Sequence, residues 1–197
     1  RDIDKKNKRT SNIREIPNGT ISAKNAFIFV IINSVLFIAT TYFINNLCLF
    51  LSPVALIIIL GYSYTKRFIP LCHLILGLGL SLAPIGAYLA VSNQFDFIPI
   101  LFSISVLCWV SGFDIIYSLQ DEEFDKKNKL YSVPVKMGKK NALHLSKLLH
   151  ILSIITLAFT SITAEFGVLY WLGLCIFSLL LIYQHTLVKH DDLSQVN

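Results

Sequence analysis

The chain has 197 residues, of which 54% are hydrophobic and only 15% charged, and its formal net charge is +5. An ordinary soluble domain carries about 25% charged residues, so this composition argues against a soluble enzyme and against a nucleic-acid-binding protein. The length suits one domain, and we expect residues 1–197 to form it. The four cysteines lie in apolar runs without metal or disulfide spacing, which predicts packing thiols: Cys48, Cys72, Cys108 and Cys175.

Long stretches without charge define the predicted elements. Between Lys24 and Lys66, 41 consecutive residues contain no Asp, Glu, Lys or Arg. A membrane helix needs roughly 20 apolar residues, so this stretch holds two spans that break at Asn45-Asn46. A soluble bundle would show charges at helical spacing, and these segments lack them. The sequence therefore predicts an all-α transmembrane helix bundle with six spans, near residues 26–44, 47–64, 70–91, 97–119, 143–163 and 166–188.

The loops between these spans differ in charge. Three short loops, at residues 45–46, 92–96 and 164–165, lie on one side, and all 17 Lys and Arg residues lie on the other. The positive-inside rule places the basic side in the cytoplasm. No short apolar stretch with a cleavage site opens the sequence, so we expect no cleavable signal peptide. These features predict an integral protein of a bacterial inner (plasma) membrane with its charged face in the cytoplasm.

Two acidic groups with adjacent basic residues precede pairs of spans. The first comprises Asp2 and Asp4 in the N-terminal arm, where five basic residues follow: Lys5, Lys6, Lys8, Arg9 and Arg14. The second runs from Asp114 to Lys127, at the end of the fourth predicted span. Ionisable residues at the edge of a bilayer are costly, so such clusters indicate function.

The second group has helical spacing. Residues three, four and seven apart share one helix face, which predicts a single stripe formed by Asp114, Tyr117, Asp121 and Asp125. Carboxylates four residues apart repel each other unless a cation lies between them, and Mg²⁺ is commonly held by one or two carboxylates plus substrate phosphates. With Lys and Arg available for phosphate oxygens, the pattern predicts a site for an amphipathic diphosphate whose tail lies in the membrane.

Simpler interpretations apply to the other charged residues. Lys and Arg in cytoplasmic loops commonly determine topology and contact anionic lipids. We expect Glu122 and Glu123 to be solvated. The histidines have no spacing that suggests a metal site, so we expect packing or interface roles for His73, His144, His150, His185 and His190.

The motifs resemble those of the UbiA superfamily of membrane prenyltransferases, most closely the 4-hydroxybenzoate polyprenyltransferase branch. The family's second aspartate motif, D-x-x-x-D, is complete as Asp121-Glu-Glu-Phe-Asp125. The start, Arg1-Asp2-Ile3-Asp4, resembles the last four positions of the first motif, N-x-x-x-D-x-x-x-D. Tyr62-Ser-Tyr-Thr-Lys66-Arg67 resembles the family's Y-x-x-x-K-R loop, and the basic loop after the first motif carries one extra residue, Ile13.

Family members have about nine spans. The resemblance therefore implies a domain truncated at both ends, with sequence missing before Arg1 and after Asn197. We expect such a fragment to be inactive alone, because it lacks half of the first metal motif.

The resemblance also implies a reaction: transfer of a polyprenyl group from a polyprenyl diphosphate to an aromatic acceptor, such as 4-hydroxybenzoate in quinone biosynthesis. Mg²⁺ held by Asp4, Asp121 and Asp125 would bridge the diphosphate oxygens. Further negative charge on the diphosphate would be taken up by four basic residues: Arg9, Arg14, Lys66 and Lys127.

The remaining candidates concern the acceptor and the allylic carbocation. Arg67 matches the planar carboxylate of 4-hydroxybenzoate, and Tyr62 and Tyr64 offer aromatic faces to the cation. Asp114 would orient the phenol or accept a proton. The candidate catalytic residues are thus Asp114, Tyr117, Asp121 and Asp125.

Other functions remain open at this stage. Within the enzyme class, the acceptor is 4-hydroxybenzoate, an aromatic acid of a menaquinone route, or a porphyrin of haem synthesis. A cation-coupled transporter would place its carboxylates near the bilayer midplane on broken helices, whereas nearly all carboxylates here lie at one rim. A structural or lipid-binding membrane protein would need the basic rim, but not three aspartates in register.

Overall fold

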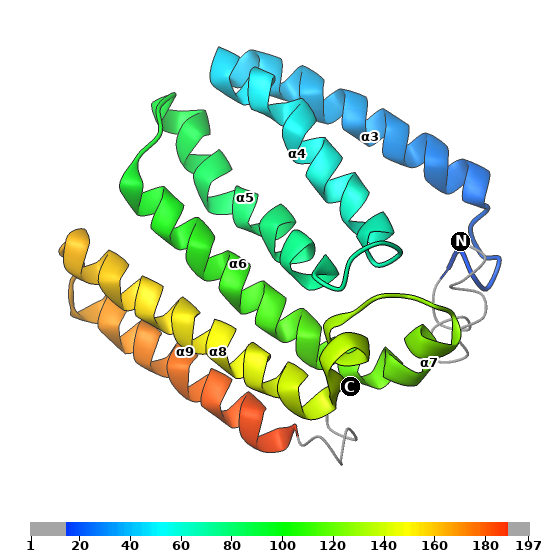
Figure 1. Cartoon of the computed structure of the whole chain (residues 1–197). Coiled ribbons are helices and arrows are strands. Elements are labelled where there is room, and N and C mark those ends of the chain that lie inside the picture. Colours follow the sequence, from blue (N-terminus) through cyan, green and yellow to red (C-terminus); the bar gives the residue numbers. More distant parts are fainter. Residues whose placement is uncertain (1–14, 189–197) are drawn as a thin grey trace. The chain divides into compact units, whose positions relative to one another are not determined.

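A computed structural model of the chain describes residues 15–188, and all regular structure in this range is helical (Figure 1). Its long helices are α3 (Ala23–Ile44), α4 (Asn46–Thr65), α5 (Cys72–Ser92), α6 (Phe97–Ser118), α8 (Val133–Thr163) and α9 (Val168–Leu187). A 3-10 turn, η1 (Leu119–Asp121), and the short α7 (Glu122–Lys127) follow α6. Six helices in the described range are long and apolar enough to cross a membrane. The predicted all-α fold with six spans is therefore confirmed.

The chain divides into two compact units, with the boundary between Pro53 and Val54, inside α4. Unit 1 contains α3 and the first part of α4. The Ser22 hydroxyl caps α3 by accepting a hydrogen bond from the Asn25 backbone N–H at 3.2 Å. At the break predicted between the first two spans, the Asn45 side chain accepts from the Cys48 backbone N–H at 2.8 Å, which starts α4. A polar Asn thus satisfies the backbone groups that a helix end leaves unpaired.

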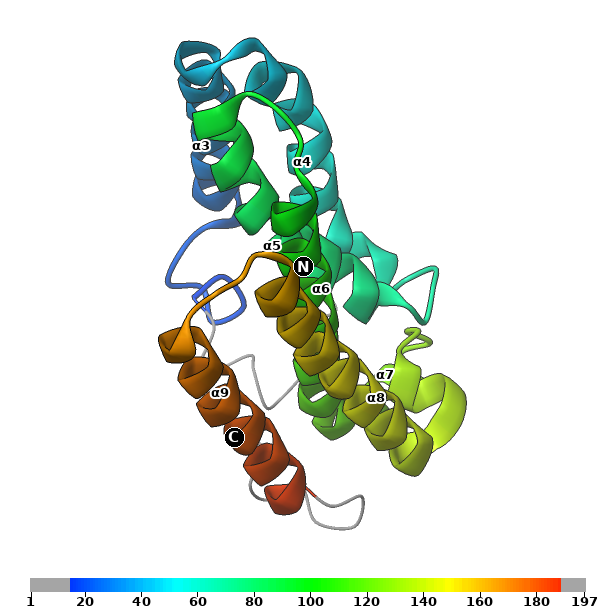
Figure 2. The same cartoon turned by 90° about the vertical axis from the view of Figure 1, so that its left-hand side faces the viewer.

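Unit 2 is built around α6, which packs against α5 on one side and α8 on the other, and α9 packs against α8 (Figures 1 and 2). Helix α5 approaches α6 at Gly77, where an added Cβ would lie 2.6 Å from the Leu107 carbonyl oxygen and 2.2 Å from Ser111 Oγ. The absence of a side chain at this one position allows the two backbones to come close, as small residues do between membrane helices.

Small polar residues join α6 to α8. The Ser105 and Ser153 hydroxyl oxygens lie 2.8 Å apart, and the Ser153 hydroxyl also donates to the Ser105 carbonyl oxygen at 3.0 Å. The Ser146 hydroxyl donates to the Gly112 carbonyl oxygen at 2.7 Å. Because no water is available inside a bilayer, these hydroxyl groups must find partners on the neighbouring helix.

His150 connects three helices from a fully buried position on α8. Its Nε2–H donates to the Trp109 carbonyl oxygen at 3.2 Å, which leaves Nδ1 to accept from His185 Nε2 at 2.8 Å. Trp109 belongs to α6 and His185 to α9. The packing role expected for His150 and His185 agrees with this arrangement.

Helix α8 begins ten residues before the predicted span at 143–163. Its N-terminus is capped by Ser132, whose hydroxyl accepts from the Val135 backbone N–H at 3.5 Å, and Pro134 occupies the first turn. Gly138, at φ 79°, interrupts the helical geometry before the apolar part begins. The basic segment that the sequence placed in a loop is therefore largely helical and extends α8 beyond the apolar region.

Candidate functional site

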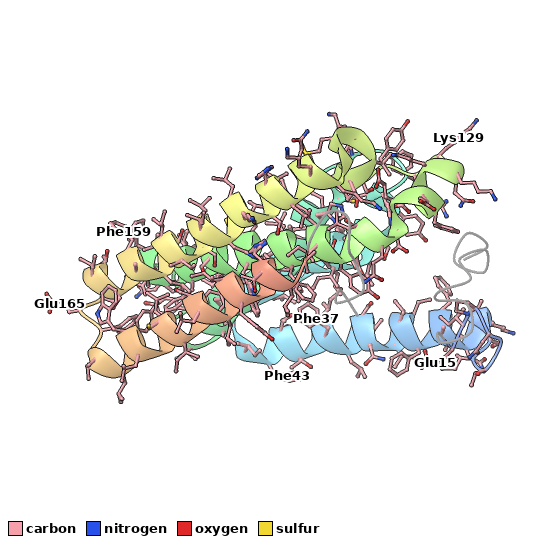
Figure 3. The ribbon with its side chains drawn as sticks, turned by 90° about the horizontal axis from the view of Figure 1, so that it is seen from below. Glu15, Phe37, Phe43, Lys129, Phe159 and Glu165 are labelled. Carbon is pink, nitrogen blue, oxygen red and sulfur yellow. The ribbon has the colours of Figure 1, made fainter. Side chains whose placement is uncertain are left out.

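The predicted site residues that fall within unit 2 gather at one end of its helices. Figure 3 shows Lys129, beyond α7, and Glu165, after α8, at opposite ends of this unit. Asp121 and Asp125 lie on η1 and α7, and Lys66 follows α4 at the same rim. The far end has few ionisable groups. There, Asp96 caps α6 through the Ile98 backbone N–H and accepts from the Tyr88 hydroxyl.

A buried ion pair joins two predicted site residues. Lys66 Nζ lies 2.7 Å from Asp125 Oδ2, and the Asp125 side chain is 0% exposed, whereas that of Lys66 is 31% exposed. Asp125 Oδ1 makes no hydrogen bond within the described residues. The nearby Asp121 carboxylate repels the Asp125 charge. The Lys66 ammonium therefore supplies a cation that this buried carboxylate requires.

Local geometry turns Asp125 inward. Helix α6 ends at Ser118, and the 3-10 turn η1 separates it from α7, so the single helical stripe predicted from Asp114 to Asp125 is interrupted. A 3-10 turn has a different residue period from an α-helix, which changes the direction in which later side chains point. Asp125 is consequently buried in the rim and does not lie on the outer surface.

The segment that follows α7 folds back against the Lys66 region. The Leu130 backbone N–H donates to the Asp125 carbonyl oxygen at 2.9 Å, and the Tyr131 backbone N–H donates to the Lys66 carbonyl oxygen at 2.8 Å. The Cys72 thiol lies 3.7 Å from the Tyr131 carbonyl oxygen. Lys66 therefore contacts α7 through its side chain and the segment after α7 through its backbone carbonyl.

A second polar pair lies beside the first. His73 Nδ1 is 2.6 Å from Asp114 Oδ2, and His73 Nε2 accepts from the Val133 backbone N–H at 3.4 Å. The His73 side chain is 3% exposed and that of Asp114 is 27% exposed. Sequence reasoning assigned His73 a packing role and missed this contact. One signal could have found it, because His73 begins one span and Asp114 ends the next, so both lie at the same membrane depth.

The expectation that Glu122 is solvated is wrong. Glu122 is 6% exposed, and its carboxylate lies 2.6 Å from Lys126 Nζ and 3.9 Å from Lys139 Nζ. Lys139 follows the irregular Gly138, which changes the course of α8 at that point. Since a buried carboxylate needs neutralising partners, Glu122 contributes to attaching α7 to α8. The other glutamate, Glu123, is exposed, as expected.

The other predicted site residues take no part in the Lys66–Asp125 and His73–Asp114 pairs. Tyr117 and Tyr62 are partly exposed, at 38% and 37%, and Tyr64 is 54% exposed. The Arg67 guanidinium lies 5.7 Å from the centre of the Tyr64 ring, which suits a cation–π contact. Lys127 is exposed and forms no ion pair among residues 15–188. Asp4, Arg9 and Arg14 lie outside the described residues.

The described donors suit a hard divalent cation only in part. Residues 15–188 contain no cluster of three or more His, Cys, Asp or Glu side chains that could hold a metal ion. They do supply two carboxylates of the D-x-x-x-D motif, and the unpaired, buried Asp125 Oδ1 is the kind of oxygen that Mg²⁺ binds. Mg²⁺ usually completes its shell with substrate phosphates and water, so Asp121 and Asp125 are oxygen donors of the chemical type that this ion prefers.

Comparison with known proteins places the arrangement in a family. The model of the UbiA prenyltransferase family matches residues 1–197. The 4-hydroxybenzoate octaprenyltransferase of Francisella tularensis subsp. mediasiatica is 33% identical over 188 residues, a match that covers 95% of this chain and 66% of the relative. The enzyme of the same name from Pseudoalteromonas translucida is 30% identical over 196 residues, covering 96% of this chain and 64% of the relative.

A solved structure shares the fold. The apo structure of a UbiA homolog from Aeropyrum pernix matches with a TM-score of 0.91 and 29% sequence identity, covering 99% of this chain and 74% of that chain. The chain spans 66% and 64% of the lengths of the two relatives above. Since the family model matches the chain from end to end, the chain belongs to the UbiA prenyltransferase family.

Proposed function

We propose that this chain belongs to an enzyme that transfers a polyprenyl group from a polyprenyl diphosphate to an aromatic acceptor, with 4-hydroxybenzoate as the first candidate. The observation that carries the proposal is the Lys66–Asp125 pair. It combines a fully buried carboxylate of the D-x-x-x-D motif with an ammonium group at 2.7 Å. A site for a magnesium diphosphate needs both charges, the anion for the metal and the cation for the phosphate oxygens.

The ion pair supports an exchange of partners when substrate binds. Asp121 and Asp125, together with Asp4 from the N-terminal arm, would hold Mg²⁺, which neutralises the diphosphate and stabilises it as a leaving group. Lys66 then leaves Asp125 and binds the diphosphate, and the Lys66 side chain is exposed enough for that movement. Lys127, Arg9 and Arg14 add positive charge where negative charge develops in the transition state.

Bond changes in the proposed reaction balance without a redox partner. The allylic C–O bond breaks, and its electron pair leaves with the diphosphate. The aromatic ring carbon ortho to the phenol then forms the new C–C bond, and a proton leaves the ring. Asp114, whose side chain is 27% exposed, is our candidate for orienting the phenol or accepting that proton.

Aromatic and cationic side chains at the rim support the acceptor part of the proposal. Tyr62, Tyr64 and Tyr117 offer ring faces that stabilise an allylic cation. Arg67 presents a planar guanidinium that matches an aromatic carboxylate with two parallel hydrogen bonds. This favours an aromatic acceptor that carries a carboxylate, such as 4-hydroxybenzoate, over one whose ring carries none.

A transfer assay tests the proposed function. Membranes containing the full-length protein should convert 4-hydroxybenzoate and a labelled polyprenyl diphosphate to a prenylated acid, with one diphosphate released per product. Chelation of divalent cations should stop the reaction, and added Mg²⁺ should restore it. An aromatic acid of a menaquinone route and a porphyrin serve as competing acceptors. Transfer to one of these alone would replace the proposed acceptor, and absence of transfer to all three would contradict the proposal.

Orientation in the membrane is a separate prediction. We propose that the end with Lys66 and Asp125 faces the cytoplasm of a bacterial inner membrane, because positive loop residues are retained on that side. Lys140 is exposed on α8. In a Lys140→Cys variant, the new thiol should not react with an impermeant maleimide in intact cells, but it should react in opened membranes. Gln94 is exposed at the opposite end. In a Gln94→Cys variant, the new thiol should react both in intact cells and in opened membranes. The parent chain corrects for its own cysteines, and the reverse pattern would invert the proposed topology.

A further inference from the structure

We propose that His73 is a positioning residue for the transfer reaction, one that holds the Asp114 carboxylate with a single oxygen directed to the acceptor. This inference rests on the proposed function. His73 lies at the start of α5, is almost fully buried, and contacts groups from two other elements, Asp114 on α6 and Val133 at the start of α8.

The close approach of α5 and α6 aligns the two side chains. Gly77 meets Leu107 and Ser111 across the interface, and the helices run in opposite directions because a short turn joins them. One helical turn before Gly77 is His73, and almost one turn after Ser111 is Asp114. The Nδ1 to Oδ2 distance of 2.6 Å is thus produced by a backbone contact that only a residue without a Cβ permits.

Two hydrogen bonds fix the orientation of the imidazole. The Val133 backbone N–H can only donate, so His73 Nε2 is its acceptor at 3.4 Å. His73 Nδ1 donates to Asp114 Oδ2 at 2.6 Å. With both ring nitrogens engaged, the imidazole cannot rotate without losing one of these bonds.

The Asp114 carboxylate is consequently held by one oxygen. Oδ2 accepts from His73, which leaves Oδ1 as the oxygen available to a ligand. Because the side chain is 27% exposed, Oδ1 is accessible from the rim. A carboxylate held through one oxygen presents the other as an oriented acceptor, which suits a group that binds the phenolic hydroxyl or takes a proton.

His73 also connects Asp114 with the segment that leads from Asp125. Val133 directly follows Ser132, which caps α8, and Tyr131 before it is bound to the Lys66 backbone. The same imidazole therefore contacts the proposed acceptor side and the segment leading from the proposed diphosphate side. This distinguishes His73 from His150, whose contacts are all with helices in the interior of the bundle.

Two substitutions separate the two hydrogen bonds. In His73→Asn, the side-chain amide nitrogen takes the place of Nδ1 and retains a donor for Asp114, whereas the bond to Val133 is lost. In His73→Gln, the amide group reaches the position of Nε2 and retains an acceptor for Val133, whereas the donor to Asp114 is lost. If His73 positions Asp114, His73→Gln should lower kcat/KM for the acceptor more than His73→Asn does.

The experiment uses the full-length protein with 4-hydroxybenzoate and a polyprenyl diphosphate. For His73→Gln, we expect kcat/KM for the acceptor to fall by about tenfold or more, because a hydrogen bond to a charged group is lost. We expect KM for the prenyl diphosphate and the melting temperature to change little. His73→Asn should retain acceptor kcat/KM to within about threefold, and His144→Gln, at an exposed histidine on α8, is the matched control.

The outcomes separate this inference from the function on which it rests. If the wild-type protein transfers a prenyl group to no aromatic acceptor, the proposed function fails. If the wild-type protein is active but His73→Asn and His73→Gln reduce activity equally and in step with the melting temperature, His73 is only a structural residue. A full effect of His73→Gln in an Asp114→Ala background would also overturn the proposal, because the two residues would then act independently.

Discussion

Replacing Asp125 with Asn should reduce prenyl transfer by about 10²- to 10³-fold or more, which is the loss expected when one group that stabilises developing charge is removed. Asn keeps the size of the side chain but removes the negative charge that would bind Mg²⁺. The side chain is fully buried, with Lys66 Nζ at 2.7 Å. Initial rates of diphosphate release from the full-length protein measure the effect.

Substitution of Lys66 distinguishes a catalytic role of the Lys66–Asp125 pair from a structural role. Lys66→Met leaves the buried Asp125 charge without its partner, and breaking a buried ion pair costs about 3–5 kcal/mol of stability. The cost should lie at the lower end of that range, because the Lys66 side chain is partly exposed. Adding Asp125→Asn to this variant removes the unpaired charge. We therefore expect the double variant to recover much of the melting temperature lost in Lys66→Met, but none of the activity.

Two results would contradict this account. If Asp125→Asn retains near-normal activity, the buried carboxylate is not part of the metal site. If the Lys66→Met, Asp125→Asn variant recovers activity together with stability, the pair serves folding alone. Circular dichroism in detergent reports the melting temperature, and the same samples supply the rates.

Gly77→Ala should destabilise the protein more than any other Gly→Ala change in α5. The added Cβ would lie 2.2 Å from Ser111 Oγ and 2.6 Å from the Leu107 carbonyl oxygen, and the latter is a backbone atom that cannot rotate away. Overpacking of this kind costs about 1–3 kcal/mol. Because the same contact aligns His73 with Asp114, we also expect acceptor kcat/KM to fall.

Gly86→Ala provides the matched control in the same helix. No atom lies within 4 Å of the position that its Cβ would occupy. The substitution should be neutral or slightly stabilising, since Ala favours a helix over Gly by about 1 kcal/mol. Equal melting temperatures for the Gly77→Ala and Gly86→Ala proteins would show that the α5–α6 contact is not as close as described.

The sequence predicted the helices well wherever the bilayer itself restricts the residues. Charge-free stretches predicted spans at 26–44 and 97–119, and the helices run over Ala23–Ile44 and Phe97–Ser118. The sequence predicted the start of α8 poorly. The predicted span begins at residue 143, whereas the helix begins at Val133, because the first turns of α8 lie in the charged rim. A helix that leaves the apolar region can carry lysines, so the distribution of charge no longer marks its end.

The sequence predicted which types of residue form the site, but not which side chains contact each other. Spacing singled out Asp121 and Asp125. The partnership of His73 with Asp114 could not be predicted, because it depends on how closely α5 approaches α6 at Gly77. The burial of Glu122 depends on the irregular backbone at Gly138, which positions Lys139. Such contacts arise from tertiary packing, which a local sequence pattern does not contain.

Lys66 makes one contact through its side chain and one through its backbone, and only the side-chain contact changes when the ammonium group moves. Its ammonium group contacts Asp125, whereas its carbonyl oxygen accepts from the Tyr131 backbone N–H at 2.8 Å. Departure of the ammonium group toward a substrate would leave the carbonyl contact intact. Anchoring of the segment after α7 is thus independent of the charge at position 66. Under the proposed mechanism, the resting arrangement would return after each turnover by movement of one flexible side chain, with no rearrangement of the backbone.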